Sequence, residues 1–164
     1  MDTIEISHAE AGDAERILYL QYAAYRTEAE LYDDFRLPPL TQTLPELLAE
    51  FRTHTILVAR RQGRIVGSVR ARVDDGAAHI GRLAVDPAWH GQGIGRGLLR
   101  GIEQATAPVE RYELFTGHRS DRNLRLYQRA GYHRIRMERR SATVSLVYLE
   151  KPGDAVHASA GPVR

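Results

Sequence analysis

Apolar residues along the chain follow two spacings, one typical of strands and one typical of helices. Alternating or continuous apolar stretches predict strands at residues 3–7, 55–59, 65–73, 79–85, 111–116, 132–137 and 144–149. Apolar residues three to four positions apart predict four helices. The first covers 13–32, the second begins at 43, the third follows the loop 90–95, and the fourth covers 121–130. The order of these elements is that of an α/β domain built on a mixed central sheet.

Local signals mark where several of these elements begin and end. The segment 37–39, Leu-Pro-Pro, is expected to end the first helix. Thr43 is expected to cap the second helix, with Glu46 completing a capping box. The turn at 62–63, Gln-Gly, predicts a hairpin between the two strands that flank it. The apolar residues of the second helix that are expected to face inward are Leu47, Leu48 and Phe51.

Length and composition predict one globular domain. The chain has 164 residues, of which 43% are hydrophobic, enough for a single core. We expect the domain to span 1–151 and the Gly-, Ala-, Pro- and Ser-rich stretch 152–164 to be a disordered tail. No apolar run approaches transmembrane length, and the N-terminus lacks the basic and apolar regions of a signal peptide. A cytoplasmic protein without membrane contact is therefore expected.

Charge and cysteine content exclude several classes of function. The chain has no cysteine, which excludes disulfides, a thiol nucleophile and a cysteine-based zinc site, and we expect no metal. Its 23 basic and 21 acidic residues nearly balance, so a nucleic-acid partner is not expected. The basic run 134–140 is interpreted as a solvated strand edge. Exposed strand edges would also allow a homodimer.

The clearest functional signal is the loop 90–95, His-Gly-Gln-Gly-Ile-Gly, between a strand and a helix. Glycine has no Cβ, so backbone N–H groups of such a loop can approach a ligand closely. The helix start adds unpaired N–H donors and the positive end of the helix dipole. A glycine-rich turn without a ligand is the alternative. Three glycines within five residues at this junction favour a phosphate or pyrophosphate site.

Two common phosphate-binding motifs do not fit this loop. In the pattern G-x-G-x-x-G, the third glycine position holds Arg96 or Leu98, depending on which glycine starts it. The P-loop is excluded because no Gly-Lys-Ser/Thr occurs in the chain. The loop instead resembles the pyrophosphate loop of the GNAT superfamily of acetyl-CoA-dependent N-acetyltransferases, Q/R-x-x-G-x-G/A. His90 departs from the Gln or Arg at its first position.

Two further features resemble the same superfamily. The order of predicted elements is similar to the GNAT fold, whose mixed sheet is splayed between its fourth and fifth strands. The segment 120–132 is similar to the N-x-x-x-Y segment that follows the fifth strand in the family. Its Asn123 and Tyr127 are four residues apart, so they would share one face of a helix and could meet one ligand.

The resemblance implies a role for several residues. The backbone N–H of Leu83 would polarise the thioester carbonyl, and Val85 would contact the pantetheine arm. Tyr127 would stabilise the departing thiolate by an O–H···S hydrogen bond and then donate its proton. The residues expected to bind acetyl-CoA are Leu83, Ala84, Val85, His90, Gly91, Gln92, Gly93, Ile94, Gly95, Arg96, Asn123 and Tyr127.

The acceptor amine must lose a proton, because a free primary amine is almost fully protonated at neutral pH. His79, His118 and the carboxylates of Glu28 and Glu30 are the alternatives for the base; each is also compatible with a solvent-facing position. The segment 25–35 matches the region that covers the acceptor site in the family. Its acidic and aromatic residues would suit a cationic amine. The residues expected to bind the substrate are Tyr25, Glu28 and Tyr32.

Two classes of function remain open. The first is an N-acetyltransferase in which the primary amine of a small molecule, or of a peptide or protein, attacks acetyl-CoA directly in a ternary complex. The second is a non-catalytic module that binds acyl-CoA and reports on it. The presence of both Asn123 and Tyr127 favours the enzyme, because a binding module has no need of an acid for the thiolate.

Overall fold

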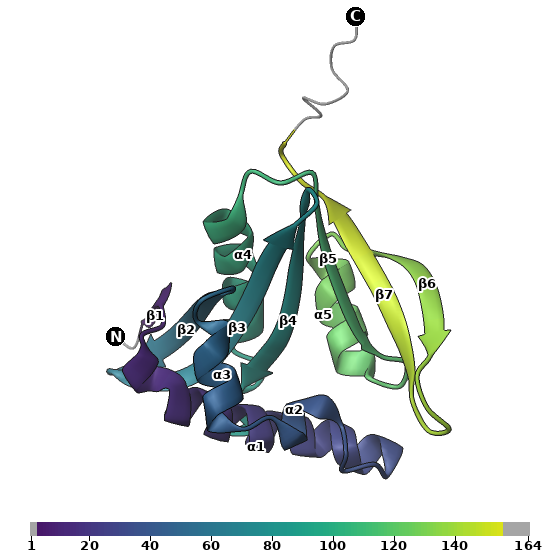
Figure 1. Ribbon diagram of the computed structural model, residues 1–164, viewed down its shortest axis with the longest axis horizontal. Coiled ribbons are helices and arrows are strands. Elements are labelled where there is room, and N and C mark those ends of the chain that lie inside the picture. Colours follow the sequence, from purple (N-terminus) through teal and green to yellow (C-terminus); the bar gives the residue numbers. More distant parts are fainter. Residues whose placement is uncertain (1–2, 156–164) are drawn as a thin grey trace, which may run out of the picture.

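The computed structural model describes residues 3–155 and is built on one seven-stranded sheet (Figure 1). The strands lie in the order β1-β2-β3-β4-β5-β7-β6. The strands are β1 (Ile4–His8), β2 (Thr55–Arg61), β3 (Arg64–Asp74), β4 (Ala77–Val85), β5 (Arg111–Gly117), β6 (His133–Arg139) and β7 (Ser145–Pro152). The helices are α1 (Ala14–Tyr32), α2 (Pro38–Thr41), α3 (Leu44–Glu50), α4 (Ile94–Thr106) and α5 (Asp121–Arg129), with 3-10 turns η1 (Ala11–Asp13) and η2 (Pro87–Trp89).

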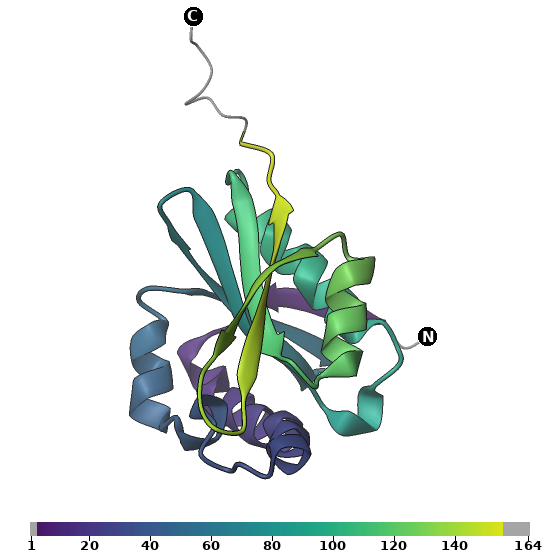
Figure 2. The same cartoon turned by 90° about the vertical axis from the view of Figure 1, so that its right-hand side faces the viewer.

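Helices cover both faces of the sheet, α1 and α3 on one side and α4 and α5 on the other (Figure 2). Alternation along β2 serves both layers, since successive side chains of a strand point to opposite faces. Ile56 and Val58 pack with the core of α1 and α3, whereas Leu57 and Ala59 pack with the core beneath α4. The predicted α/β architecture is therefore confirmed.

The sheet is splayed between β4 and β5, as the resemblance implied. These two strands form the parallel pair of the sheet and are paired only over 77–79 and 111–113, so they part after His79 and Glu113. On its other side, β4 contains a bulge. Ser68 pairs with Ala84 and Arg70 with Gly81, which leaves two β4 residues opposite one β3 residue.

Two local expectations are corrected. The segment 37–39 does not end α1, which stops at Tyr32 because Asp33 adopts the left-handed conformation with a φ of 53°. Pro38 instead begins the additional short helix α2, because proline is well suited to the first turn of a helix. Leu48, expected to face inward, is 39% exposed, whereas Leu47 is fully buried. The capping box of α3 is present, with the Glu46 N–H donating to Thr43 Oγ1 at 3.3 Å. Leu47 is the buried residue of α3, and Leu48 lies about 100° further round this short helix, away from the core.

The remaining expectations concern the basic run, the C-terminal stretch and membrane-spanning segments. The exposed edge strand β6 confirms the solvated strand edge expected for the basic run. The N–H of Gly153 donates to the Glu110 carbonyl and that of Ala155 to the Val109 carbonyl. The rest of the predicted tail, 156–164, lies outside the described residues. No helix within 3–155 is long and apolar enough to cross a membrane.

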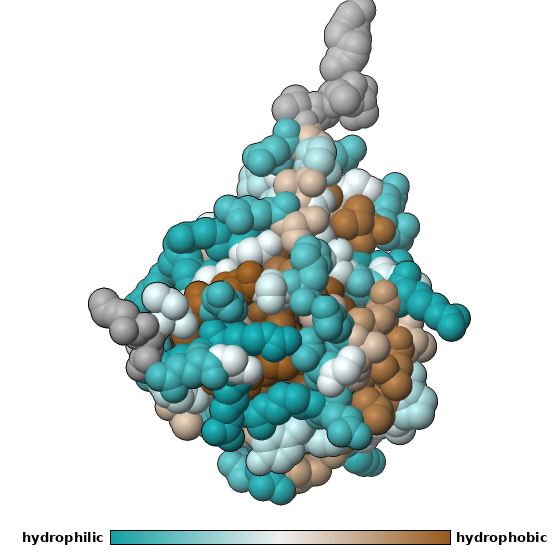
Figure 3. Space-filling model, turned by 90° about the vertical axis from the view of Figure 1, so that its left-hand side faces the viewer, coloured by the Kyte–Doolittle hydropathy of each residue, from teal (hydrophilic) through white to brown (hydrophobic). Residues whose placement is uncertain are grey.

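Glycines let α4 pack closely on the edge strand β1. An added Cβ at Gly97 would lie 3.2 Å from the Ile6 side chain, and one at Gly101 would lie 3.1 Å from it. A groove lies between β1 and α4, lined by residues of both elements. Figure 3 shows this face of the molecule, where apolar side chains are surrounded by hydrophilic ones. The packing fixes α4, and with it the loop at its start, relative to the sheet.

Candidate active site

The glycines of the loop 90–95 have two different functions. Gly91 and Gly93 have φ of 79° and 81°, in the left-handed region that favours glycine, and a Cβ on either would meet nothing within 4 Å. Gly93 is also the N-cap of α4. A Cβ on Gly95, by contrast, would lie 3.3 Å from the Leu126 side chain. Two glycines therefore bend the loop beside open space, and the third lets α4 pack against α5.

The polar side chains of the loop are held by the protein. His90 Nε2 lies 3.2 Å from the Val85 carbonyl. Burial, with the nearby charge of Arg122, lowers the pKa of His90, so the neutral ring donates its N–H to that carbonyl. Gln92 Oε1 accepts a 3.2 Å hydrogen bond from Arg61. The first backbone N–H groups of α4, where Ile94 is buried and Arg96 exposed, have no acceptor within the helix and remain available to a ligand.

The face of α5 that carries Asn123 and Tyr127 points toward the sheet. Asn123 Nδ2 donates to Thr116 Oγ1 at 3.2 Å, which fixes this face against β5. Tyr127 is 6% exposed, and its ring packs edge-on against Tyr132 with centroids 6.3 Å apart. Burial raises the pKa of Tyr127, so the phenol stays protonated. Within residues 3–155 its hydroxyl has no hydrogen-bond partner.

The α1 residues expected at the acceptor site lie near α5. Ser120 Oγ donates to Glu28 Oε1, and the backbone N–H of Arg119 donates to the Tyr32 hydroxyl at 2.8 Å. Both side chains therefore anchor the loop that precedes α5. Burial raises the pKa of Tyr25, and the same phenol, with Glu28, contributes to the raised pKa of Tyr127. Tyr25 and Glu28 thus lie within electrostatic reach of the predicted acid.

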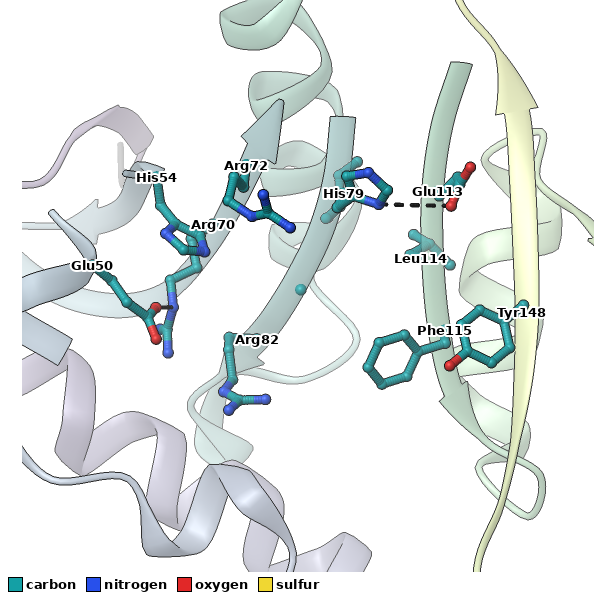
Figure 4. A pocket seen from close by; sticks show the side chains of 12 residues that line it. Glu50, His54, Arg70, Arg72, His79, Arg82, Glu113, Leu114, Phe115 and Tyr148 are labelled. Atoms are coloured by element: carbon teal, nitrogen blue, oxygen red, sulfur yellow. Dashed lines mark ion pairs between the residues drawn. The ribbon is translucent and has the colours of Figure 1, made fainter. Parts of the chain in front are cut away.

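A cavity of about 320 Å³ lies where β4 and β5 part (Figure 4). Cationic side chains from β3 and β4 form one wall, and Phe115 and Tyr148 form the other, with ring centroids 5.3 Å apart. His79 Nδ1 lies 3.6 Å from Glu113 Oε1 at the point of separation. The full lining is Glu50, His54, Arg70, Arg72, His79, Ile80, Gly81, Arg82, Glu113, Leu114, Phe115 and Tyr148.

The two histidines proposed as bases differ in position. His79 lines the cavity, whereas His118 does not. The ring of His118 packs against Tyr32, and its Nδ1 accepts a 3.1 Å hydrogen bond from the Ser145 backbone N–H. None of Tyr25, Glu28 and Tyr32 lines the cavity either.

Sequence reasoning missed most of the cavity wall, above all its arginines. One available signal was Arg70, a charged residue in the middle of the otherwise apolar strand β3. A side chain of that kind is rarely buried unless it is paired. No comparable signal marks Arg82, whose position depends on the bulge in β4.

Residues 52–134, just over half of the chain, match the family model of the acetyltransferase (GNAT) domain. The protein belongs to the GNAT acetyltransferase family. The match includes β2 to β5, the glycine loop and α5. The resemblance carried by the loop and the N-x-x-x-Y segment is thereby confirmed at the level of the superfamily.

Three curated proteins are similar in sequence to this chain. The S-(2-succino)cysteine N-acetyltransferase of Bacillus subtilis (strain 168) is 29% identical over 133 residues, covering 74% of this chain and 79% of that protein. The mycothiol acetyltransferase of Kineococcus radiotolerans is 34% identical over 80 residues, covering 48% of this chain and 26% of that protein. The UPF0157 protein YqkA of Bacillus subtilis is 27% identical over 129 residues, covering 79% of this chain and 37% of that protein. The chain thus spans little more than a third of the latter protein and about a quarter of the mycothiol enzyme.

Solved structures share the fold along nearly the whole chain. The ribosomal-protein-S18-alanine N-acetyltransferase of Escherichia coli superposes with a TM-score of 0.78 at 16% identity, covering 94% of this chain and 96% of that one. The PaiA N-acetyltransferase of Thermoplasma acidophilum, solved in complex with coenzyme A, gives 0.74 at 16% identity, covering 92% and 99%. At these identities the likeness shows the GNAT fold.

Proposed function

We propose that this GNAT protein is an acetyl-CoA-dependent N-acetyltransferase that acts on the primary amine of a small molecule. The observation that carries the proposal is Tyr127. Its ring is buried, its pKa is raised, and its hydroxyl has no partner among the described residues. Such a phenol is protonated and free to donate, as an acid for a departing thiolate must be. A module that only bound acyl-CoA would not need this group.

The residues of the donor site fit acetyl-CoA, which supplies an activated acetyl thioester. The loop would hold the pyrophosphate with the backbone N–H groups beside Gly91 and Gly93, where the backbone is bent and the adjacent space is open. Leu83 lies in the β4 bulge, where one residue is left out of the ladder pairing. Its N–H would therefore be available to polarise the thioester carbonyl.

The chemistry requires that the C–N bond form while the C–S bond breaks. The amine attacks the thioester carbon directly, and Tyr127 donates its hydroxyl proton to the leaving sulfur. A thiol has a pKa of ~8.5 and a phenol one of ~10, so donation is unfavourable in bulk water. In the buried site the basicity of the thiolate is raised, so the phenol first stabilises the departing sulfur through a strong O–H···S hydrogen bond and then passes its proton to it.

We assign His79 as the base that removes the proton from the acceptor amine. Its ring lines the cavity, and Glu113 lies 3.6 Å from its Nδ1, close enough to orient it. His118, which accepts a hydrogen bond from Ser145 outside the cavity, is the alternative. Glu28 is already bonded to Ser120 and is the weaker carboxylate candidate.

The cavity favours a small molecule over a protein side chain as acceptor. Its volume of about 320 Å³ lies at the small end of the range for ligand pockets. Relatives named for mycothiol and S-(2-succino)cysteine support the same class of acceptor. A panel of small amines and N-terminal peptides, assayed by release of free thiol from acetyl-CoA, tests this. Turnover with small amines is expected. Turnover with peptides alone would contradict the proposal, and tight binding of acetyl-CoA without turnover would favour the binding module.

A further inference from the structure

We infer that the acceptor amine carries a carboxylate group, which the guanidinium of Arg82 binds. The inference rests on the proposed function and names the class of its substrate. The amine is that of an α-amino acid or a derivative of one, with an apolar side chain. This differs from the cationic acceptor that the acidic segment 25–35 led us to expect.

Arg82 lines the cavity without a partner of its own. Within the described chain its guanidinium makes no hydrogen bond or ion pair, and its Nε is buried and unsatisfied. A buried donor without an acceptor is costly, so such a group in a cavity wall indicates a missing ligand. The backbone of Arg82 has a φ of 54°, unusual for a non-glycine residue, and it lies in the β4 bulge. Strained backbone and bulges of this kind commonly direct side chains into functional sites.

Arg70, on the neighbouring strand β3, is held in place by other residues. Its side chain is 2% exposed, with Nε 2.6 Å from Glu50 and Nη2 2.6 Å from Gln42. Arg70 also lines the cavity, and its Nη1 is buried without a partner among the described residues. Two arginines of adjacent strands that line one cavity therefore each carry an unsatisfied N–H donor.

The ion pairs around the cavity leave Arg82 as the uncompensated cation. Glu50 compensates the charge of Arg70, and Asp74 lies 3.8 Å from Arg72. The carboxylate of Glu113 is paired with Arg111 at 2.5 Å. Among the described residues, no carboxylate lies within 4.0 Å of the Arg82 guanidinium. A ligand that enters here is therefore expected to bring a negative charge.

The position of Arg82 favours a carboxylate close to the reacting amine. A guanidinium matches the planar carboxylate with two parallel hydrogen bonds. Arg82 precedes Leu83, whose N–H we place at the thioester carbonyl, so a carboxylate held by Arg82 lies next to the reacting carbon. In an α-amino acid the amine is attached one carbon away from the carboxylate. The rings of Phe115 and Tyr148, across the cavity from the arginines, offer an apolar surface to the side chain (Figure 4).

The experiment uses matched triplets of amines with acetyl-CoA at saturation. Each triplet contains an apolar L-amino acid, its amide and the corresponding decarboxylated amine, with spermidine as a cationic comparison. Because charged hydrogen bonds are involved, we expect kcat/KM for the amino acid to exceed that for its amide about 10- to 100-fold. In Arg82→Gln this preference is lost, while the KM for acetyl-CoA and the rate with the amide stay near wild type. Arg82→Lys should restore part of this preference, since lysine keeps the positive charge but lacks the paired N–H donors of the guanidinium.

Arg72→Gln is the matched control, because this arginine lines the same cavity but is paired with Asp74. It should retain the preference for the carboxylate. Equal kcat/KM for acids and amides in the wild type, or an equal loss for both in Arg82→Gln, would overturn the inference while leaving the acetyltransferase in place.

Calorimetry of the same amino acids on protein saturated with coenzyme A gives a readout that is independent of turnover. Binding that is lost in Arg82→Gln would support the inference even if no amine were acetylated, in which case only the proposed function would fail. Absence of binding together with absence of turnover for every carboxylate would overturn the inference.

Discussion

A valine at Gly93 should separate the ligand-binding role of the glycine loop from its conformational role. Gly93 has a φ of 81° and open space where a Cβ would project. Gly63, in the turn between β2 and β3, has nearly the same geometry, with a φ of 78° and no atom within 4 Å of an added Cβ. The two substitutions thus impose the same backbone strain, at the proposed pyrophosphate site and away from it.

The magnitudes follow from this matched geometry. A non-glycine residue in the left-handed region costs about 1–2 kcal/mol. In a chain of this size such a cost lowers the Tm by roughly 2–8 °C. Both Gly93→Val and Gly63→Val should show that shift. Only Gly93→Val should also lose hydrogen bonds to the pyrophosphate. One lost charged hydrogen bond is worth ~1.5–3 kcal/mol, or about a 10- to 100-fold rise in the Kd for acetyl-CoA.

Calorimetry with acetyl-CoA and with pantetheine, which lacks the pyrophosphate, is the assay. We expect Gly93→Val to weaken acetyl-CoA binding and to leave pantetheine binding nearly unchanged. Gly63→Val should bind both ligands as the wild type does. Equal losses for the two ligands, or an equal effect of the two substitutions, would refute the assignment of the loop.

Three further changes test other parts of the site. Gly117→Ala should destabilise the protein by about 1–3 kcal/mol in urea denaturation, because its Cβ would collide with the Tyr32 hydroxyl; unchanged stability would contradict this contact. Burial lowers the pKa of His90 in the folded protein, so below about pH 6.5 the unfolded chain binds a proton at this residue more readily than the folded protein does. The free energy of unfolding therefore decreases as the pH is lowered. His90→Gln should therefore lose less Tm than the wild type between pH 7.5 and 5, and parallel losses would argue against the shift. His79→Gln should lower kcat about 100-fold at pH 7, less as the pH rises toward the pKa of the amine, and a rate equal to wild type would remove His79 as the base.

The sequence predicted the elements, and the residues of the proposed donor site could be named from it, because both depend on local signals. Apolar spacing marks each strand and helix, and the glycines near Gly93 act through their own backbone conformation. Asn123 and Tyr127 share a helix face by their spacing alone. Such features need no knowledge of which distant segments meet.

The proposed acceptor side, the cavity between β4 and β5, could not be predicted, because it depends on contacts between distant segments. Arg70 is held by Glu50 and Gln21, residues of two helices that reach it only in the folded chain. Arg82 is oriented by a bulge whose presence depends on the register between β3 and β4. The exposure of Leu48 likewise depends on which face of a short helix contacts the sheet. Hydrophobic spacing gives no information on any of these.

The kcat of Tyr127→Phe tests the central claim most directly. The substitution keeps the buried ring and removes the hydroxyl that we propose protonates the leaving sulfur, so kcat should fall by ~10²–10⁴-fold with little change in acetyl-CoA affinity. Tyr132→Phe is the control: its hydroxyl donates to Glu103 at 2.7 Å, so that variant should lose about 1 kcal/mol of stability and keep its kcat. A Tyr127→Phe enzyme with wild-type kcat would contradict the account.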